Sequence, residues 1–342
     1  MWNYFRKIER YNFLKKNEIL KIIENNEFLE SEKEKILMER PSEIVRFYDE
    51  NKNIISSMYL WNDVPDYKSK KTLYIGNIKT FQLQKNLNKI DILFKKLFKI
   101  LKGEGFQIII GPLNGTTWNR YRYVVEKGDR EPFFMEPWNE DEEVKFIEHI
   151  GFSPFKYYFS SIMENTENRK TLKEKIEKIK KFPFYKKISI KNADTKNFEK
   201  LFSKIYDIST ESFKNNFLYT KLEKNIFMKM YSKYKEKFLS NFFKLLYFEK
   251  RLIGFAFAFP DYLEIERAGK TETIIFKTGG VIPEFNGKGL GYILLDAIID
   301  EVEKSKYNKL ILALTFKSNV SKNMAEHVAK PFRKYALFIK EL

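Results

Sequence analysis

The chain has 342 residues, of which 43% are hydrophobic and 17% aromatic, enough apolar material for two domains with buried cores. It has no cysteine and two histidines, which excludes disulfides, thiolate metal sites and a cysteine nucleophile and argues against a multi-histidine metal centre. The formal charge is +17, but lysine supplies 52 of the 63 basic residues. Because arginine is the usual reader of base edges, we interpret the charge as a solvated surface that favours anionic small ligands, and we expect no nucleic-acid partner.

The N-terminal segment, MWNYFRKIERYNFLKK, is charged and amphipathic and lacks the apolar stretch of a signal peptide. The most notable apolar run, residues 252–260, is too short to cross a bilayer. We therefore expect a cytoplasmic protein without a membrane span.

In chain order, the first half predicts strand, helix, strand, helix and strand over residues 72–83, 87–102, 107–110, 140–150 and 155–162. Residues 166–181 predict a highly charged surface helix with a narrow apolar stripe, ended by Phe182-Pro183. In the second half, residues 242–248 and 252–259 predict a β-hairpin. The order strand, helix, strand, helix and strand then recurs over residues 273–282, 290–304, 310–316, 320–328 and 334–341.

The recurrence of this order roughly 200 residues later predicts a duplicated fold. We expect a first domain over residues 1–165, a linker helix over residues 166–185 and a second domain over residues 186–342.

Three glycines fall within five positions of the segment VIPEFNGKGLG, which begins at Val281 and leads into the predicted helix. A glycine-rich turn that opens a helix suits phosphate, because backbone N–H groups and the helix dipole face the anion. The segment lacks the Ser or Thr of a P-loop, and its G-x-G-x-G spacing does not fit a dinucleotide fingerprint. The alternative is a simple tight turn in which glycine serves a positive φ.

The segment resembles motif A of the GNAT acetyltransferases, V-x-P-x-x-[RQ]-G-x-G-x-[GA]. The matching positions are Val281, Pro283, Gly287, Gly289 and Gly291. Asn286 stands where the family usually has Arg or Gln. Residues 188–194 (ISIKNAD) resemble the opening strand of the family, so the resemblance covers about residues 186–342. In the first half, residues 111–122 (GPLNGTTWNRYR) resemble a loop of uncharacterised bacterial proteins with two tandem GNAT-like domains. The implied fold is α/β (α+β), with a mixed, mostly antiparallel sheet flanked by helices in each domain.

The resemblance implies acetyl-CoA, or another acyl-CoA, as the cofactor. The residues expected to bind it are Val281, Asn286, Gly287, Lys288, Gly289, Leu290, Gly291, Asn319 and Ser321. It also implies that a primary amine of a small molecule, amino acid or peptide attacks the thioester directly, which requires a base and a proton donor. Glu272 is one candidate base, with Glu264 and Glu266 as others, and His327 or Tyr335 is the candidate acid.

When the halves are laid over each other, Asn86 and Asn88 fall opposite Gly289 and Gly291. We therefore expect the first copy to have lost its CoA loop. Its segment of residues 111–139 could shape a substrate pocket against the second domain, or its aromatic residues could simply pack the domain interface.

Two other functions remain open on the sequence. A Fem-like transferase that uses aminoacyl-tRNA would suit the duplicated architecture and the basic charge. A non-catalytic CoA-binding module would suit a chain in which one copy is already degenerate.

Overall fold

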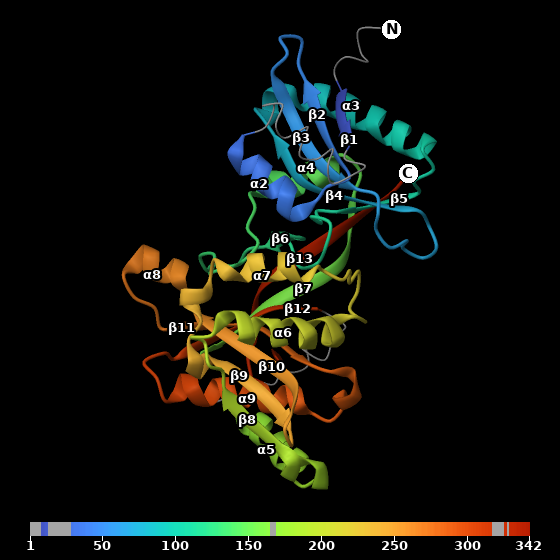
Figure 1. Ribbon diagram of the computed structural model, residues 1–342. Coiled ribbons are helices and arrows are strands. Elements are labelled where there is room, and N and C mark those ends of the chain that lie inside the picture. The colour runs from blue at the N-terminus through green and yellow to red at the C-terminus, as the bar shows by residue number, and fades with distance from the viewer. Residues whose placement is uncertain (1–7, 13–28, 165–168, 317–324, 327) are drawn as a thin grey trace. The chain divides into compact units, whose positions relative to one another are not determined.

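The computed structural model describes residues 8–12, 29–164, 169–316, 325–326 and 328–342. It divides into two compact units, each of which contains part of the strands (Figure 1). Unit 1 consists of Met1–Val125, Asn139–Lys156 and Ala336–Leu342. Unit 2 consists of Glu126–Trp138 and Tyr157–Tyr335. Each unit therefore contains a segment from the opposite half of the sequence.

The sheet of unit 1 contains, in spatial order, β1 (Ile8–Asn12), β2 (Glu43–Tyr48), β3 (Ile54–Trp61), β4 (Thr72–Thr80), β5 (Ile108–Gly111) and the end of β13 (Lys330–Glu341). Neighbouring strands are antiparallel except β4 and β5, which are parallel. Helix α3 (Leu83–Gly103) connects that parallel pair and buries an apolar face with helical spacing, Ile90, Leu93, Phe94, Leu97 and Leu101. The remaining elements that begin in this part of the chain are α2 (Glu30–Glu39), β6 (Tyr123–Glu126) and α4 (Asp141–His149).

The sheet of unit 2 contains, in spatial order, β8 (Ile188–Asn192), β9 (Phe243–Phe248), β10 (Arg251–Pro260), β11 (Thr273–Val281), β12 (Lys309–Phe316) and the end of β7 (Ser153–Glu164). Again one pair is parallel, β11 with β12, and it is connected by a helix, α9 (Leu290–Glu303). The other helices are α5 (Lys170–Lys180), α6 (Phe198–Phe213), α7 (Lys224–Ser232) and α8 (Tyr262–Ala268). The predicted fold, two mixed and mostly antiparallel sheets flanked by helices, is confirmed.

Helices cover both faces of the sheet in unit 2, as the residue pattern of β10 shows. Phe257 lies on one face, against Phe202 of α6 and Tyr231 of α7. Ala256 and Ala258, which point to the opposite face, belong to the core that includes α9. Small residues on this side let α9 pack closely against the strands.

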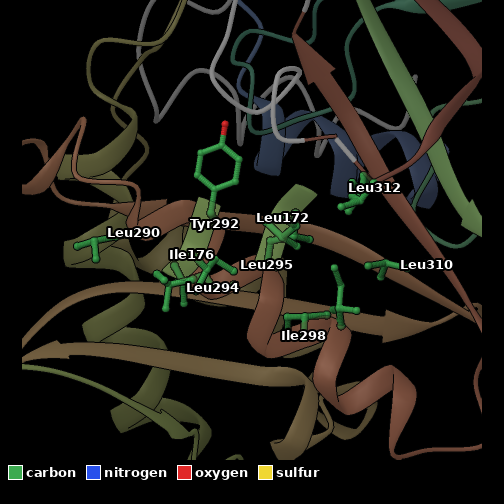
Figure 2. Close-up of a cluster of buried hydrophobic side chains, with 14 of the residues drawn as sticks. Leu172, Ile176, Leu290, Tyr292, Leu294, Leu295, Ile298, Leu310 and Leu312 are labelled. Atoms are coloured by element: carbon green, nitrogen blue, oxygen red, sulfur yellow. The ribbon is translucent and has the colours of Figure 1, made fainter. Parts of the chain in front are cut away.

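Helix α5 confirms the helix predicted over residues 166–181, and it packs on α9 within unit 2. Its apolar stripe, Leu172, Ile176 and Ile179, is buried in the core that α9 shares (Figure 2). Helix α9 thus has apolar contacts on the sheet side and on the α5 side. None of the helices in the described part of the chain combines the length and apolar character needed to cross a bilayer.

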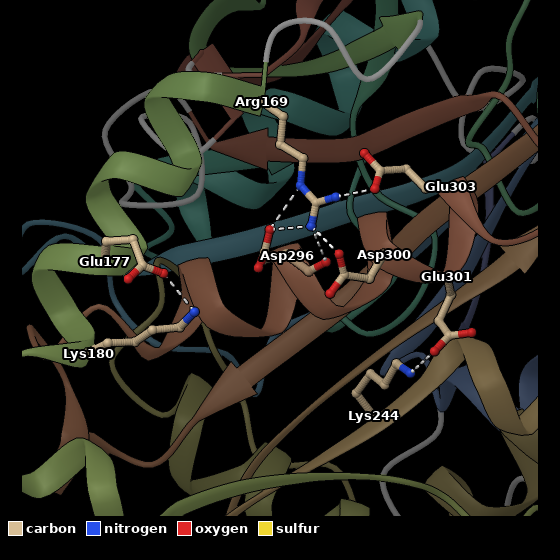
Figure 3. Close-up of polar contacts among 8 residues, drawn as sticks. All are labelled: Arg169, Glu177, Lys180, Lys244, Asp296, Asp300, Glu301 and Glu303. Carbon is tan, nitrogen blue, oxygen red and sulfur yellow. Dashed lines mark hydrogen bonds and ion pairs between the residues drawn. The ribbon is translucent and has the colours of Figure 1, made fainter.

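Arg169, directly before α5, fixes this helix to α9 by charge. Its side chain is buried, and it forms ion pairs with three carboxylates of α9 (Figure 3): Asp296 at 2.5 Å, Glu303 at 2.5 Å, and Asp300. Hydrogen bonds to these carboxylates outweigh the cost of burial and raise the pKa of Arg169. One guanidinium therefore serves three acids that would otherwise repel one another.

We predict that Arg169→Met lowers the free energy of unfolding by about 2 kcal/mol, because the three carboxylates lose their common cation. Urea unfolding of the full chain measures this change. Lys180→Met, which removes only the exposed pair with Glu177, is the matched control and should cost less than about 0.5 kcal/mol. Equal losses in the two variants would show that Arg169 does not anchor α5.

Candidate functional site

Strands β11 and β12 run side by side for four residues and then separate. The register pairs residues 273–276 with residues 309–312 and stops there, although β11 continues to Val281 and β12 to Phe316. Both strands are irregular just beyond this point. Lys277 is an extra residue in the pairing of β11 with β10, and Leu314 of β12 has a φ of 60°. Because a bulge bends its strand, the far half of β11 has an edge without a strand partner on the β12 side among the described residues.

The chain leaves this open edge through the glycine segment and enters α9 at Leu290. A short 3-10 turn, Pro283–Phe285, comes first, and the N–H of Asn286 donates to the Pro283 carbonyl at 3.0 Å. Gly287 and Gly289 both have a φ of 76°, a left-handed conformation that glycine adopts without strain.

The five N–H groups from Gly287 to Gly291 have no hydrogen-bond acceptor among the described residues. N–H groups in the first turn of a helix lack intrahelical partners and carry the positive end of the helix dipole. These five N–H groups are therefore a candidate anion site, whereas the N–H of Asn286 is already used by the Pro283 carbonyl.

Gly287 and Gly289 differ in what surrounds them. A Cβ atom at Gly289 would lie 2.4 Å from Cδ1 of Ile179 on α5, so this glycine is required for helix packing as well as for its φ. A Cβ atom at Gly287 would meet no heavy atom within 4 Å. Gly287 is thus the position at which ligand binding can be tested without disturbing the core.

The remaining residues expected to bind the cofactor differ in the groups that they offer a ligand. Val281 ends β11 opposite Gly254, and the buried side chain of Leu290 leaves only its N–H for a ligand. Lys288 is exposed, with its ammonium 4.6 Å from the centre of the Phe285 ring. The residues that lie outside the described part of the chain are Asn319, Ser321 and His327.

Glu272 and Tyr335 are not gathered around the glycine segment. Glu272 precedes β11 at the end where β11 and β12 still pair, with its carboxylate 3.6 Å from Nζ of Lys309. At about 3.3 Å per residue, the length of β11 separates it from the glycines. Tyr335 is fully buried and its hydroxyl donates to Glu136; burial, followed by that carboxylate's charge, raises the pKa of Tyr335 well above its ordinary value.

A buried ion pair that sequence reasoning missed holds a segment from the first half of the chain in unit 2. Arg333 of β13 and Glu136 are 2.6 Å apart, and both side chains are 0% exposed. Arg333 also donates to the Lys127 carbonyl at 2.7 Å, and Glu136 accepts the N–H of Phe133 at 3.0 Å. Burial raises the pKa of Glu136, and Arg333 opposes that rise.

This segment, Glu126–Trp138, reaches the point where β11 leaves β12. Phe133 packs with Ile275 and Ile311 of the two strands, and Nζ of Lys277 donates to the Met135 carbonyl at 3.1 Å. For the segment of residues 111–139 the sequence left two roles open, shaping a substrate pocket or packing the domain interface. Its residues Glu126–Trp138 lie in unit 2 beside the point where β11 and β12 separate. Phe133 itself is core packing.

The connection that follows β4 in unit 1 is shorter than its counterpart in unit 2. Only residues 81–82 link β4 to α3, where residues 282–289 link β11 to α9. Gln82 caps α3 with a left-handed φ of 47°, as Gly289 caps α9. Gln82 is therefore the counterpart of Gly289, and the expected alignment of Asn86 and Asn88 with the glycines was wrong, because both lie inside α3. The first copy lacks the loop itself.

In unit 1, protein atoms fill the edge of β4 that corresponds to the unpaired edge of β11 in unit 2. Beyond the last parallel pair, the N–H of Leu113 donates to the Ile75 carbonyl at 2.9 Å. The N–H of Asn77 donates to Oδ1 of Asn114 at 3.1 Å, and Nδ2 of Asn114 donates to Glu39 at 3.1 Å. In unit 1 the chain's own atoms thus fill a strand edge whose counterpart has no strand partner among the described residues of unit 2.

We predict that Asn114→Ala lowers the free energy of unfolding by about 2 kcal/mol, because it leaves the half-buried N–H of Asn77 without its acceptor and Glu39 with one donor fewer. Chemical denaturation measures this loss. Asn88→Ala, at an exposed position of α3, is the control and should change the stability little. If both variants were equally stable, Asn114 would not be the group that fills this edge.

For the buried pair, we expect Glu136→Gln to lower the free energy of unfolding by about 3 kcal/mol, because Arg333 would keep its charge without its carboxylate. Glu126→Gln breaks the pair with Lys334, which is more exposed, and should cost less than about 1 kcal/mol. Thermal and urea unfolding of the two variants give the comparison. A Glu136 variant no weaker than the Glu126 variant would contradict the assignment.

Residues 202–327 match the Acetyltransferase (GNAT) family, and no curated protein matches the sequence. Similar solved structures include a probable N-acyltransferase from Enterococcus faecalis V583, with a TM-score of 0.55 and 10% identity over 98% of this chain and 72% of that one. They also include a GCN5-related glucosamine N-acetyltransferase region of a fungal multi-domain GH3 β-N-acetylglucosaminidase, with a TM-score of 0.51 and 12% identity.

The fungal match covers 97% of this chain, which spans 38% of the fungal one. At such identities these structures are alike in fold alone. The family match covers the strand opening, the glycine segment and α9, the elements that form the candidate site. Residues 202–327, in the second half of this chain, are thus similar to the GNAT acetyltransferases.

Proposed function

We propose that the protein is a CoA-dependent N-acyltransferase. It transfers an acyl group, with acetyl as the simplest case, to the primary amine of a small molecule, an amino acid or a peptide. One observation carries this proposal: in the described part of the chain, the five N–H groups from Gly287 to Gly291 have no acceptor, and they directly follow the edge of β11 that has no strand partner. Together these features suit the diphosphate and the amide-bearing arm of an acyl-CoA.

The residues of unit 2 fit such a coenzyme in three respects. The glycine segment offers N–H groups for the diphosphate, and Gly287 adjoins open space. The edge of β11 from Thr278 to Val281 offers backbone groups for the pantetheine amides. The thioester would supply the activated acyl carbon, and the chain's own residues would bind and orient it for a neutral amine.

The absence of cysteine suits direct attack by the amine, because no covalent intermediate on the protein is needed. A Fem-like transferase would not need the glycine loop that unit 2 retains, so the structure gives that alternative no support of its own. A non-catalytic module would bind acetyl-CoA equally well, but it would release no thiol in the presence of amines.

We predict that Gly287→Asp raises the Kd for acetyl-CoA at least about tenfold over Gly287→Asn, since the new carboxylate would face the diphosphate. Asn and Asp have the same shape, and both tolerate a left-handed φ, so the pair differs only in charge. Calorimetric titration of both variants and the wild type at one salt concentration gives the three constants. Equal constants for the variants, or no binding by the wild type, would contradict the proposal.

A further inference from the structure

The turn that ends α5 brings two phenylalanines to the surface of unit 2. Phe182 follows the helix, and Phe184 lies in the short 3-10 turn Pro183–Lys187. Their rings are stacked, with centroids 6.0 Å apart and planes inclined by 24°. Phe182 is 57% exposed. The pair therefore presents a flat aromatic surface to which another planar ring can be added.

Two sets of contacts place this pair beside the glycine segment. The N–H of Phe182 donates to the Ile179 carbonyl at 3.1 Å, and Cδ1 of Ile179 is the atom that lies 2.4 Å from the Cβ position of Gly289. The centre of the Phe184 ring is 5.7 Å from Nζ of Lys288, the residue between the two glycines with left-handed φ. The aromatic pair thus adjoins the five N–H groups of the candidate anion site.

The Lys288 side chain lies between the aromatic pair and the glycine segment. Its ammonium is 4.6 Å from the centre of the Phe285 ring and 5.7 Å from that of Phe184, distances that suit cation–π attraction. No carboxylate in the described part of the chain pairs with this ammonium. A positive charge therefore separates a stacking surface from a set of N–H groups without acceptors.

The chemistry of the proposed ligand indicates what would occupy this surface. Coenzyme A carries one planar aromatic group, its adenine, and a single ribose joins that base to the diphosphate. When the N–H groups of the glycine segment hold the diphosphate, the adenine lies within one sugar of it, where the aromatic pair is exposed. Stacking on aromatic side chains is a common way in which proteins bind a base, because every base has a π-face.

We propose that Phe182 and Phe184 bind the adenine of the acyl-CoA by stacking, an inference that rests on the proposed function. The exposed ring of Phe182 contacts the base, and Phe184 supports that ring from the side of Lys288. Both phenylalanines lie outside residues 202–327, the part that matches the family. The contact with the base is therefore supplied by the turn between α5 and β8, before the matched part begins.

The test compares Phe182→Ala with Phe81→Ala in the full chain, using calorimetric titration with CoA and with 4′-phosphopantetheine, which lacks the nucleotide. Phe81 is 45% exposed in unit 1, so its variant removes a similar ring away from the site. We expect Phe182→Ala to raise the Kd for CoA about tenfold and Phe81→Ala to change it less than about twofold. Phe182→Tyr, which keeps the ring, should bind CoA like the wild type. The Kd for 4′-phosphopantetheine should be the same in all variants.

Melting curves of the unliganded variants separate binding from folding, and Phe182→Ala should melt within a few degrees of the wild type because its ring is exposed. If Phe182→Ala binds CoA as tightly as the wild type, this inference is overturned and the proposed function stands. An equal loss with CoA and 4′-phosphopantetheine would also overturn it, because the base would not be the group in contact. So would a wild-type dimer that Phe182→Ala separates without a change in CoA affinity, which would make the surface an interface between copies. If the wild type does not bind CoA, both proposals fall.

Discussion

The separation of β11 from β12 after Phe276 is the constraint on which the site depends. Backbone N–H and C=O groups inside a protein need partners, so a strand edge that loses its neighbour must be filled by protein, water or ligand. In unit 1 the Asn114 side chain and the backbone of Leu113 fill the corresponding edge of β4. Among the described residues of unit 2, the corresponding edge of β11 has no strand partner and is followed by five N–H groups without an acceptor. The same strand edge is thus occupied by protein atoms in unit 1 and has no strand partner in the described part of unit 2.

The start of α9, which forms the candidate anion site, is held in place because α9 is packed on two sides. The strands contact one side through small residues of β10, and α5 contacts the other through its apolar stripe and Arg169. Gly289 is needed for two reasons. Its left-handed φ suits the residue that caps α9, and its lack of a side chain leaves room for Ile179 of α5. Helix α5, which the sequence predicts as a charged linker, therefore packs against the glycine segment of the candidate site.

Local features were predictable from the sequence, and long-range pairing was not. The glycine segment, the helix over α9 and the recurring order of strands depend on spacing within a few residues. The exchange of β7 and β13 between the units joins residues far apart in the chain, as does the pair Arg333–Glu136 across 197 positions. Nothing in one sequence marks Arg333 among eleven arginines. The alignment of Asn86 with Gly289 failed because a shortened loop leaves no trace in composition.

The same limit applies to the catalytic groups. The chain has 46 acidic residues, and the predicted order of strands does not indicate which of them is the catalytic base. Glu272 lies at the end of β11 away from the glycines. We propose that one acyl-CoA binds per chain, at the edge of β11 in unit 2. The stoichiometry of a calorimetric titration with acetyl-CoA is the most direct test. We expect one molecule bound per chain, and either two molecules or none would contradict binding at this edge alone.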